Sequence, residues 1–387
     1  MRTAAHTWDL VVVGAGPAGS AAALSALHRA PDLRVLLVDR ADFPRDKACG
    51  DGVAPHVLDV LATVGVHDLL DDLPSLRRLR ISQGGHVADR RLARPVWVVP
   101  RTDLDARLVA RAAAAGARRE RHRVRSLDEL DAQVVVGADG VHSVVRGELL
   151  GGRPGRRAVA IRGYTPTPPE LAGLQVIRYG DRRQPSYAWC FDRGDGLANV
   201  GYGELVDGGD DLTRSRLLGE LERLLPGTVA DGRAWRAAHL PLSGLPRPHA
   251  AGRVLLAGDA AHLVNPMTGE GIYHAVATGV LAGRAAADAL TAGRPESAGL
   301  AYTRAVRRLL DRHQRHTALT ARLSAVPRVV AAAIDAASRH QGIFDDLVEI
   351  GLGPGTISPR LVGGLAHALA RPAPLTGPTD VESSWRS

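Results

Sequence analysis

Three glycines near the N-terminus have the spacing of a nucleotide-binding turn. Gly14, Gly16 and Gly19 follow the apolar residues 10–13 and open an Ala- and Leu-rich segment that is typical of a helix. In this arrangement the first glycine makes a tight turn, the second lets the backbone approach a pyrophosphate, and the third lets the helix pack on the strand. The start of the helix adds unpaired N–H groups and a positive partial charge. The pattern predicts a dinucleotide site, to which we also assign Ala18.

An acidic residue stands where such a site needs one. Asp39 comes 20 residues after Gly19 and directly follows the segment RVLLV (34–38), which predicts a second strand. A carboxylate at the end of the second strand binds the ribose hydroxyls of a dinucleotide. We therefore expect Asp39, together with its neighbour Arg40, to contact the nucleotide.

Two further pairs of residues follow apolar segments in the same way. Asp139 and Gly140 end one such segment, and Gly258 and Asp259 end another. Because an α/β sheet presents its ligands at the carboxyl ends of its strands, both pairs are expected at the nucleotide site.

The spacing of apolar residues indicates the strands and helices that must position these residues. Each apolar segment predicts a short buried strand, and the alternation over 157–203 predicts further strands. Helices are predicted over 103–115 and 269–290. The last part of the chain, 300–370, reads mostly as helices, with breaks at Pro327, Gly342 and Pro354.

Composition limits the classes of protein that remain. The chain has 387 residues, of which 45% are hydrophobic and 23% charged, so it is long enough for two or three globular lobes. The net charge of +8 comes almost entirely from arginine, and the basic residues are spread along the chain. That spread argues against a nucleic-acid partner but leaves attraction to an anionic membrane open. Two cysteines and an N-terminus without an apolar core predict a cytoplasmic location.

Several segments together resemble a family of flavoproteins. VVVGADGVHSVVR (134–146) and RVLLAGDAAHLVNPMTGEGI (253–272) resemble the second and third fingerprints of the FAD-dependent group that includes aromatic hydroxylases, flavin halogenases and geranylgeranyl reductases. Within that group, three stretches resemble elements of the geranylgeranyl reductases: FPRDKACGDG (43–52), YAWCFDRGDGLANVGYG (187–203) and NPMTGEGIYHA (265–275). The chain is thus similar to the FAD-dependent geranylgeranyl reductase family over about residues 8–365.

The resemblance implies roles for particular residues around FAD. Asp259 would bind the ribityl chain, and the Asp139-Gly140 turn would lie near the pyrophosphate. Arg101, in an Arg-x-x-Leu-Asp element, would also contact the cofactor. The start of the long helix would face the isoalloxazine, and its residues in the predicted site are Gly269, Gly271 and Ile272. No metal site is predicted.

The fold implied is α/β and discontinuous. A doubly wound, Rossmann-like FAD-binding domain would comprise 1–79, 101–158 and 248–295. A mostly antiparallel sheet for the substrate would comprise 80–100 and 159–247, and the C-terminal helical region would be 296–370. We expect a disordered tail at 371–387, because it contains three prolines and a Ser-rich end.

The activity implied is reduction of carbon–carbon double bonds in a polyprenyl or other lipophilic substrate. The predicted cavity residues are Tyr187, Trp189, Cys190, Phe191 and Asp192. Asp192 stands where the family has proline, and a carboxylate in the cavity wall would argue against an isoprenoid.

Other functions share the same cofactor and fold. A monooxygenase that hydroxylates or epoxidises a natural-product intermediate is the main alternative, whereas the halogenase pattern Trp-x-Trp-x-Ile is replaced here by Tyr187-Ala-Trp189-Cys-Phe191. A flavoprotein scaffold without activity is a third alternative. The segment Gly351–Gly355 lacks the spacing of a second dinucleotide turn, so electrons would come from transiently bound NAD(P)H or from a separate reductase or ferredoxin.

Cys49 and Lys47 are the predicted catalytic residues. Cys49 would lie beside the reacting carbon, positioning the substrate or helping to supply a proton, with Cys190 on the opposite wall. The only lysine in the chain, Lys47, would approach the flavin or substrate as a point charge and lower the pKa of the thiol. The alternatives are that Cys190 is a core residue and that Lys47 is a surface charge.

The helical region also allows peripheral contact with a membrane. Residues 329–334 form an apolar run bordered by arginines. The alternative is that this run packs on the FAD-binding domain.

Overall fold

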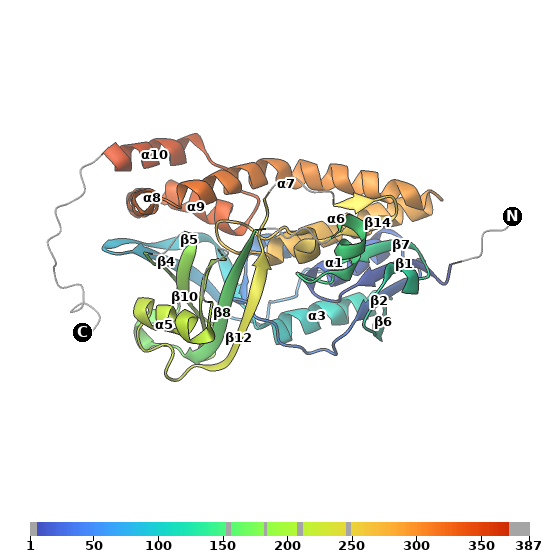
Figure 1. Cartoon of the computed structure of the whole chain (residues 1–387), viewed down its shortest axis with the longest axis horizontal. Helices are drawn as coiled ribbons and strands as arrows, with labels where there is room; N and C mark the ends of the chain where they lie inside the picture. The colour runs from blue at the N-terminus through green and yellow to red at the C-terminus, as the bar shows by residue number, and fades with distance from the viewer. Residues whose placement is uncertain (1–5, 152–155, 182–183, 207–211, 245–248, 371–387) are drawn as a thin grey trace.

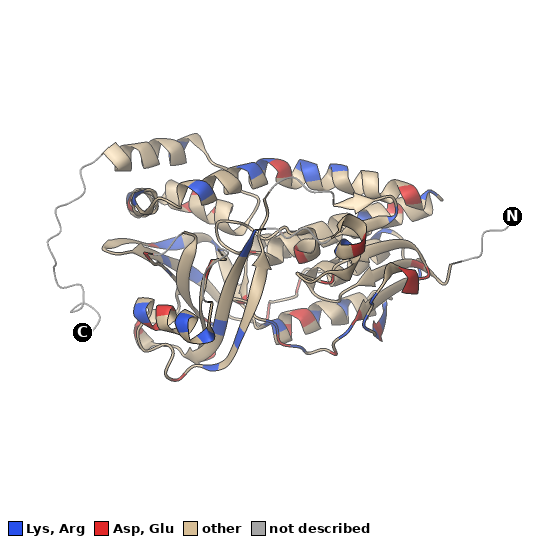
Figure 2. Cartoon of the chain, in the orientation of Figure 1, with Lys and Arg blue, Asp and Glu red and all other residues tan. Residues whose placement is uncertain are grey.

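The computed structural model describes residues 6–151, 156–181, 184–206, 212–244 and 249–370. The predicted tail, 371–387, lies outside the described residues. Figure 1 shows two sheets side by side, with long C-terminal helices lying across both. Basic and acidic residues are scattered over both sheet-containing parts and over the longest of these helices (Figure 2).

The first sheet is the Rossmann-like one, and its order confirms the doubly wound prediction. Its strands run in the order β13-β14-β7-β1-β2-β6, and all neighbours are parallel except β13 and β14. The chain starts at β1 and adds strands first on one side and then on the other, which creates the switch point where nucleotides bind. The bounds are β1 (Trp8–Val13), β2 (Val35–Asp39), β6 (Arg118–Arg121), β7 (Ala132–Gly137), β13 (Ala250–Ala251) and β14 (Val254–Leu256).

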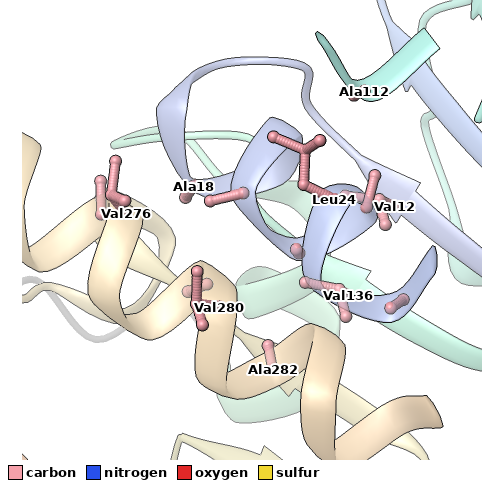
Figure 3. Packing of buried hydrophobic residues seen from close by; sticks show 14 of the residues in the cluster. Val12, Ala18, Leu24, Ala112, Val136, Val276, Val280 and Ala282 are labelled. Atoms are coloured by element: carbon pink, nitrogen blue, oxygen red, sulfur yellow. The ribbon is translucent and has the colours of Figure 1, made fainter. Parts of the chain in front are cut away.

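Three helices cover this sheet, and two of them touch through their backbones. These helices are α1 (Pro17–Arg29), α3 (Arg101–Ala114) and α6 (Ile272–Thr291), and α1 packs against both of the others. A Cβ atom on Gly279 or Gly283 of α6 would lie 2.2 or 2.1 Å from a backbone oxygen of α1. Figure 3 shows how the side chains of Ala18, Val276 and Val280 fill the space beside this contact. The close approach fixes the start of α1, and with it the glycine turn.

The second sheet is mostly antiparallel, as expected. Its order is β12-β8-β11-β10-β9-β4-β5-β3, and β4 and β9 are the parallel neighbours. The boundaries predicted at 79/80 and 158/159 fall inside β4 and β8, because both strands begin earlier than the alternation suggested. The bounds are β3 (Gly52–Val53), β4 (Ser75–Gln83), β5 (His86–Val98), β8 (Arg157–Pro166), β9 (Gln175–Tyr179), β10 (Ser186–Asp192), β11 (Leu197–Leu205) and β12 (Arg233–Pro241).

The helices after α6 close one side of both sheets. They are α7 (Ala298–Leu323), α8 (Pro327–Arg339), α9 (Gln341–Leu352) and α10 (Pro359–Ala370). The break expected at Gly342 instead falls at His340, and Gly342 lies within α9. Within the described residues, no single helix is long and apolar enough to cross a membrane; only the α7 region and α8 together pass that test, and they meet at a bend of 114°. The shorter helices are α2 (Pro55–Ala62), α4 (Val144–Leu150) and α5 (Arg214–Leu224).

Candidate functional site

A cavity of about 930 Å³ connects the glycine turn to the C-terminal helices. At one end it is lined by the β1–α1 turn and by the strand ends of the Rossmann-like sheet. In the middle it passes β10 and the segment 45–54, and at the far end it runs between β4, β5 and the helices α7 to α10. Most of the predicted cofactor and substrate residues therefore border one continuous space; Gly19, Gly258, Cys190 and Asp192 do not line it.

The glycine turn has the geometry of a dinucleotide cradle. Gly14 has a φ of +99°, and a Cβ there would lie 2.3 Å from the carbonyl oxygen of Ala138. A Cβ on Gly19 would lie only 1.7 Å from the carbonyl oxygen of Gly14. The turn can therefore bring its backbone close to a ligand only with glycine at these positions. Gly16 and Ala18 border the cavity from the same turn.

Asp39 is held rigidly at the edge of this cradle. Its Oδ2 accepts a hydrogen bond of 2.8 Å from the N–H of Ala15, and its Oδ1 accepts one of 2.9 Å from the N–H of Ala41. Each oxygen keeps a further lone pair, and both Asp39 and Arg40 line the cavity. The geometry fits an acid that accepts ribose hydroxyls, and that contact stays a prediction.

Two arginines lie beside the cradle and share one buried carboxylate. Arg101 donates to both oxygens of Asp105 at 2.7 and 2.8 Å, and Arg45 reaches Asp105 at 3.1 Å. Burial opposes the charge of Arg101, but Asp105 outweighs it and raises the pKa of Arg101 above its usual value. A Cβ on Gly16 would lie 3.1 Å from Nη2 of Arg45. Sequence reasoning did not single out Arg45, although it lies inside the 43–52 motif, and a second cation suits a pyrophosphate.

The Asp139-Gly140 turn lies against the cradle, but the carboxylate of Asp139 is already engaged. Oδ1 of Asp139 accepts a hydrogen bond of 2.5 Å from the hydroxyl of Ser143, and Oδ2 accepts one of 2.7 Å from the N–H of Val144. Burial raises the pKa of Asp139. Asp139 thus holds the start of α4 in place, while Gly140, with a φ of +82°, lets the turn follow the cavity wall.

Asp259 is paired with Lys47 across the cavity. The Lys47 ammonium donates to Oδ2 of Asp259 at 2.9 Å. Burial alone would raise the pKa of Asp259, but Lys47 and the nearby Arg101 hold it below its usual value, so Asp259 stays ionised. Gly258 has a φ of +59°, and a Cβ there would lie 3.1 Å from the Cβ of Ala18. The strand end that was predicted to contact FAD thus lies directly against the glycine turn.

The entry to α6 places its glycines on the cavity wall. The helix begins at Ile272, after Gly271, and Gly269 has a φ of +69°. Glu270 accepts a hydrogen bond of 2.6 Å from the N–H of Tyr273 and contacts Nδ1 of His274 at 3.0 Å. Glu270 therefore caps the helix and favours its dipole, and both glycines and Ile272 remain on the cavity side.

Cys49 borders the cavity, but its thiol is not activated in the way the sequence suggested. Burial, with the negative charge of Asp51, raises the pKa of Cys49; Lys47 opposes this only weakly. Lys47 does act to lower the pKa of the thiol, as expected, but burial and Asp51 outweigh it, so the thiol is not activated. A thiol with a raised pKa keeps its proton at neutral pH.

Asp51 is a site residue that sequence reasoning missed. Its side chain is fully buried, and Oδ2 accepts hydrogen bonds from the hydroxyl of Tyr164 at 2.6 Å and from Nδ2 of Asn199 at 2.7 Å. Oδ1 has no hydrogen-bond partner among the described residues. Burial raises the pKa of Asp51 to about 6 despite those two bonds. Its place two residues after Cys49 in CGDG was the available signal.

One network joins Cys49 to the aromatic wall of the cavity. Asn199 donates to the carbonyl oxygen of Cys49 at 2.9 Å and accepts from Nε1 of Trp189 at 2.7 Å. Tyr187, Trp189 and Phe191 follow one another along β10, with ring centroids 6.0 and 6.4 Å apart, and all three line the cavity. The two motifs that resemble the reductase family thus form a single wall.

Cys190 and Asp192 do not belong to that wall, and their assignment to the cavity is corrected. Side chains alternate along a strand, so these two residues point to the other face of the sheet. Cys190 is buried there in a cluster that includes Leu217 and Leu221 of α5. Asp192 accepts hydrogen bonds from the hydroxyl of Thr167 and the N–H of Gly173 at 3.0 and 2.7 Å. Asp192 therefore does not make the cavity polar and gives no argument against an isoprenoid.

The far half of the cavity is apolar. Its wall is formed by aliphatic side chains from β4, β5 and the C-terminal helices, among them Leu79, Ile81, Val96, Val330 and Ile334. The run 329–334 therefore contributes to the cavity wall, and Val330 and Ile334 pack on the second sheet. This space suits a hydrocarbon chain.

Fold and site together define a flavoprotein oxidoreductase, and residues 222–317 match a family model described as an FAD binding domain. The chain is 36% identical over 321 residues to the menaquinone reductase of Mycolicibacterium smegmatis, covering 74% of this chain and 76% of that protein. It is 30% identical to digeranylgeranylglycerophospholipid reductase 1 of Methanopyrus kandleri, covering 73% and 81%. The chain belongs to the geranylgeranyl reductase family. A geranylgeranyl bacteriochlorophyll reductase-like protein of Thermoplasma acidophilum has the same fold, with a TM-score of 0.73 at 21% identity over 94% of this chain and 96% of that one.

Proposed function

We propose that this chain reduces carbon–carbon double bonds in a polyprenyl or other lipophilic substrate. The observation that carries the proposal is the continuity of the cavity from the dinucleotide cradle to an apolar space between sheet and helices. The names of the relatives, which include a menaquinone reductase and a digeranylgeranylglycerophospholipid reductase, agree with a substrate of this class.

The cradle residues would hold FAD without a covalent bond. The glycine turn and the two arginines suit the pyrophosphate, Asp39 suits the adenosine ribose, and Asp259 suits the ribityl chain. Bound and reduced FAD supplies a hydride. The chain's own task is to hold the substrate beside the flavin, to keep water away and to provide a proton for the neighbouring carbon.

We assign Cys49 as the proton donor. Its thiol borders the cavity and stays protonated because burial raises its pKa. Asn199 fixes the backbone at Cys49 and also holds Trp189, so the thiol and the aromatic wall keep one relative position. The apolar lining beyond them prevents the hydride from being lost to water or oxygen.

The electron donor is either transiently bound NAD(P)H or a separate reductase or ferredoxin. Purified enzyme under anaerobic conditions would be mixed with NADPH, NADH or reduced ferredoxin, and bleaching of the flavin absorbance would identify the donor. The cytoplasmic location inferred from the two cysteines stays a prediction.

The decisive experiment compares Cys49→Ala with the matched variant Cys190→Ala. Both remove one thiol, but only the first removes it from the cavity. With chemically reduced holoenzyme and a polyprenyl substrate, the product should gain about two mass units without oxygen. Cys49→Ala should keep its flavin spectrum and lose at least about tenfold in turnover, a lower bound because a positioned proton donor typically contributes about 10²- to 10⁴-fold. Cys190→Ala should keep the wild-type turnover.

Two results would contradict the proposal. A product that forms only with oxygen and gains about sixteen mass units would identify the chain as a monooxygenase. Unchanged turnover in Cys49→Ala would remove the thiol from the reaction and leave it a packing residue.

A further inference from the structure

The far end of the cavity opens among side chains that also face solvent. Leu319 and Leu323 of α7 and Val362 of α10 line the cavity, and they are 46%, 41% and 55% exposed. A side chain that borders both the cavity and the outside forms its rim. The opening therefore lies between the end of α7 and α10, on the side of the molecule that the C-terminal helices cover (Figure 1).

The apolar surface continues beyond the rim. Val326, at the corner between α7 and α8, is 51% exposed, and Leu369, two turns after Val362 on α10, is 40% exposed. Among the described residues these five form most of the large apolar side chains that are this exposed. Single exposed apolar residues are ordinary, but a group around a cavity mouth marks an interaction site.

Positive charge accompanies this surface. Arg322 and Arg328 flank the corner, both are exposed, and neither forms an ion pair with another described residue. Basic residues also follow the length of α7 (Figure 2). Apolar side chains between arginines are the combination that binds to the interface of an anionic membrane.

We propose that the α7–α8 corner, together with the exposed face of α10, is a docking surface for an anionic lipid bilayer. The α7 region and α8 meet at 114° and Val326 is exposed at this corner, so the corner can enter the bilayer interface without any segment crossing the bilayer. The cavity then opens onto the lipid, and a prenyl chain enters from the bilayer without passing through water. This last step rests on the proposed function, whereas the docking itself does not.

The test measures binding of flavin-loaded, full-length protein to vesicles of phosphatidylcholine with and without phosphatidylglycerol. Val326→Asp should weaken binding roughly tenfold, which corresponds to losing the burial of one Val side chain. Arg322→Glu with Arg328→Glu should weaken binding at least about tenfold, and only to vesicles that contain the anionic lipid. None of these three residues lines the cavity, so turnover of a detergent-solubilised substrate should be unchanged.

Matched controls lie at the other end of α7. Leu300 is 58% exposed, and Arg304 and Arg308 are exposed, so Leu300→Asp and the double variant Arg304→Glu with Arg308→Glu place changes of the same kind far from the corner. Both should leave vesicle binding unchanged. The flavin spectrum of each variant shows that it is folded, and Val326→Ser replaces Val326→Asp if the latter loses its flavin.

The possible results separate docking from activity. Selective loss of vesicle binding in the corner variants supports the docking surface, even if no prenyl substrate is reduced. Absent binding, equal losses in the Leu300 and Arg304 controls, or self-association that involves Val326 would overturn it. Binding that appears only after deletion of residues 371–387 would also overturn it, because the tail would then be the occupant of this surface.

Discussion

Asp51→Asn should stabilise the protein at alkaline pH and lose that advantage in acid. Burial raises the pKa of Asp51 from the usual 3.8 to about 6. Above pH 6 the carboxylate is charged in both the folded and the unfolded protein. Its ionisation then destabilises the folded state by about 3 kcal/mol, because each pKa unit corresponds to about 1.4 kcal/mol. The penalty shrinks as the pH falls through the folded-state pKa and disappears below the unfolded-state value. Asparagine has the same shape and no charge, so the variant escapes this penalty.

The measurement is urea denaturation of wild type and variant with saturating FAD, followed by tryptophan fluorescence. The variant's free energy of unfolding relative to wild type should be higher at about pH 8 than at about pH 4.5, by about 2 kcal/mol. The unpaired amide that replaces the carboxylate lowers the free energy of unfolding equally at both pH values. This effect therefore cancels in the difference.

The control is Asp32→Asn, which makes the same chemical change at an exposed position. A difference within about 0.5 kcal/mol for Asp51→Asn, or one of opposite sign, would refute the reasoning, because it would mean that the folded protein holds the charge of Asp51 without a penalty.

Three further substitutions test the cradle and its support. Gly19→Ala should abolish FAD binding, seen as loss of flavin absorbance, because the new Cβ would lie 1.7 Å from the oxygen of Gly14. Arg45→Ala should weaken FAD binding about tenfold by flavin fluorescence titration, since a charge-assisted contact to the pyrophosphate is lost; unchanged affinity would exclude Arg45 from the site. Gly283→Ala should lower the free energy of unfolding by at least about 2 kcal/mol, because a Cβ there would lie 2.1 Å from the backbone of α1; a stability equal to wild type would show that α1 and α6 can separate without loss.

Local backbone geometry explains why the cradle was predictable. The tight turn at Gly14 and the contact at Gly19 depend on the absence of a Cβ, and glycine is the residue type that records this requirement in the sequence. The strands around the turn are buried on both faces and therefore appear as unbroken apolar segments such as 35–38. The glycines that form the motif also form the turn, so recognising the motif was enough to locate the cradle.

The sequence also indicates which side chains of β10 face the cavity, but we followed the family motif and not the alternation of the strand. The motif covers consecutive residues from Tyr187 to Asp192, whereas a strand sends neighbouring side chains to opposite faces. Tyr187, Trp189 and Phe191 share one face by period two alone, so Cys190 had to lie on the other. Reading the segment as a strand first would have separated the cavity residues from the core residue.

The electrostatics of the site could not be derived from the sequence, because each group is governed by a distant one. Lys47 is two residues from Cys49, and this proximity suggested an activated thiol. The ammonium instead binds Asp259, which is 212 residues away in the chain, and the thiol is left with burial as its main influence. Asp51 likewise owes its raised pKa to the strands that bury it and not to its neighbours in the motif. The sign of a pKa shift is decided by competition between burial and charge, and both are properties of the folded chain.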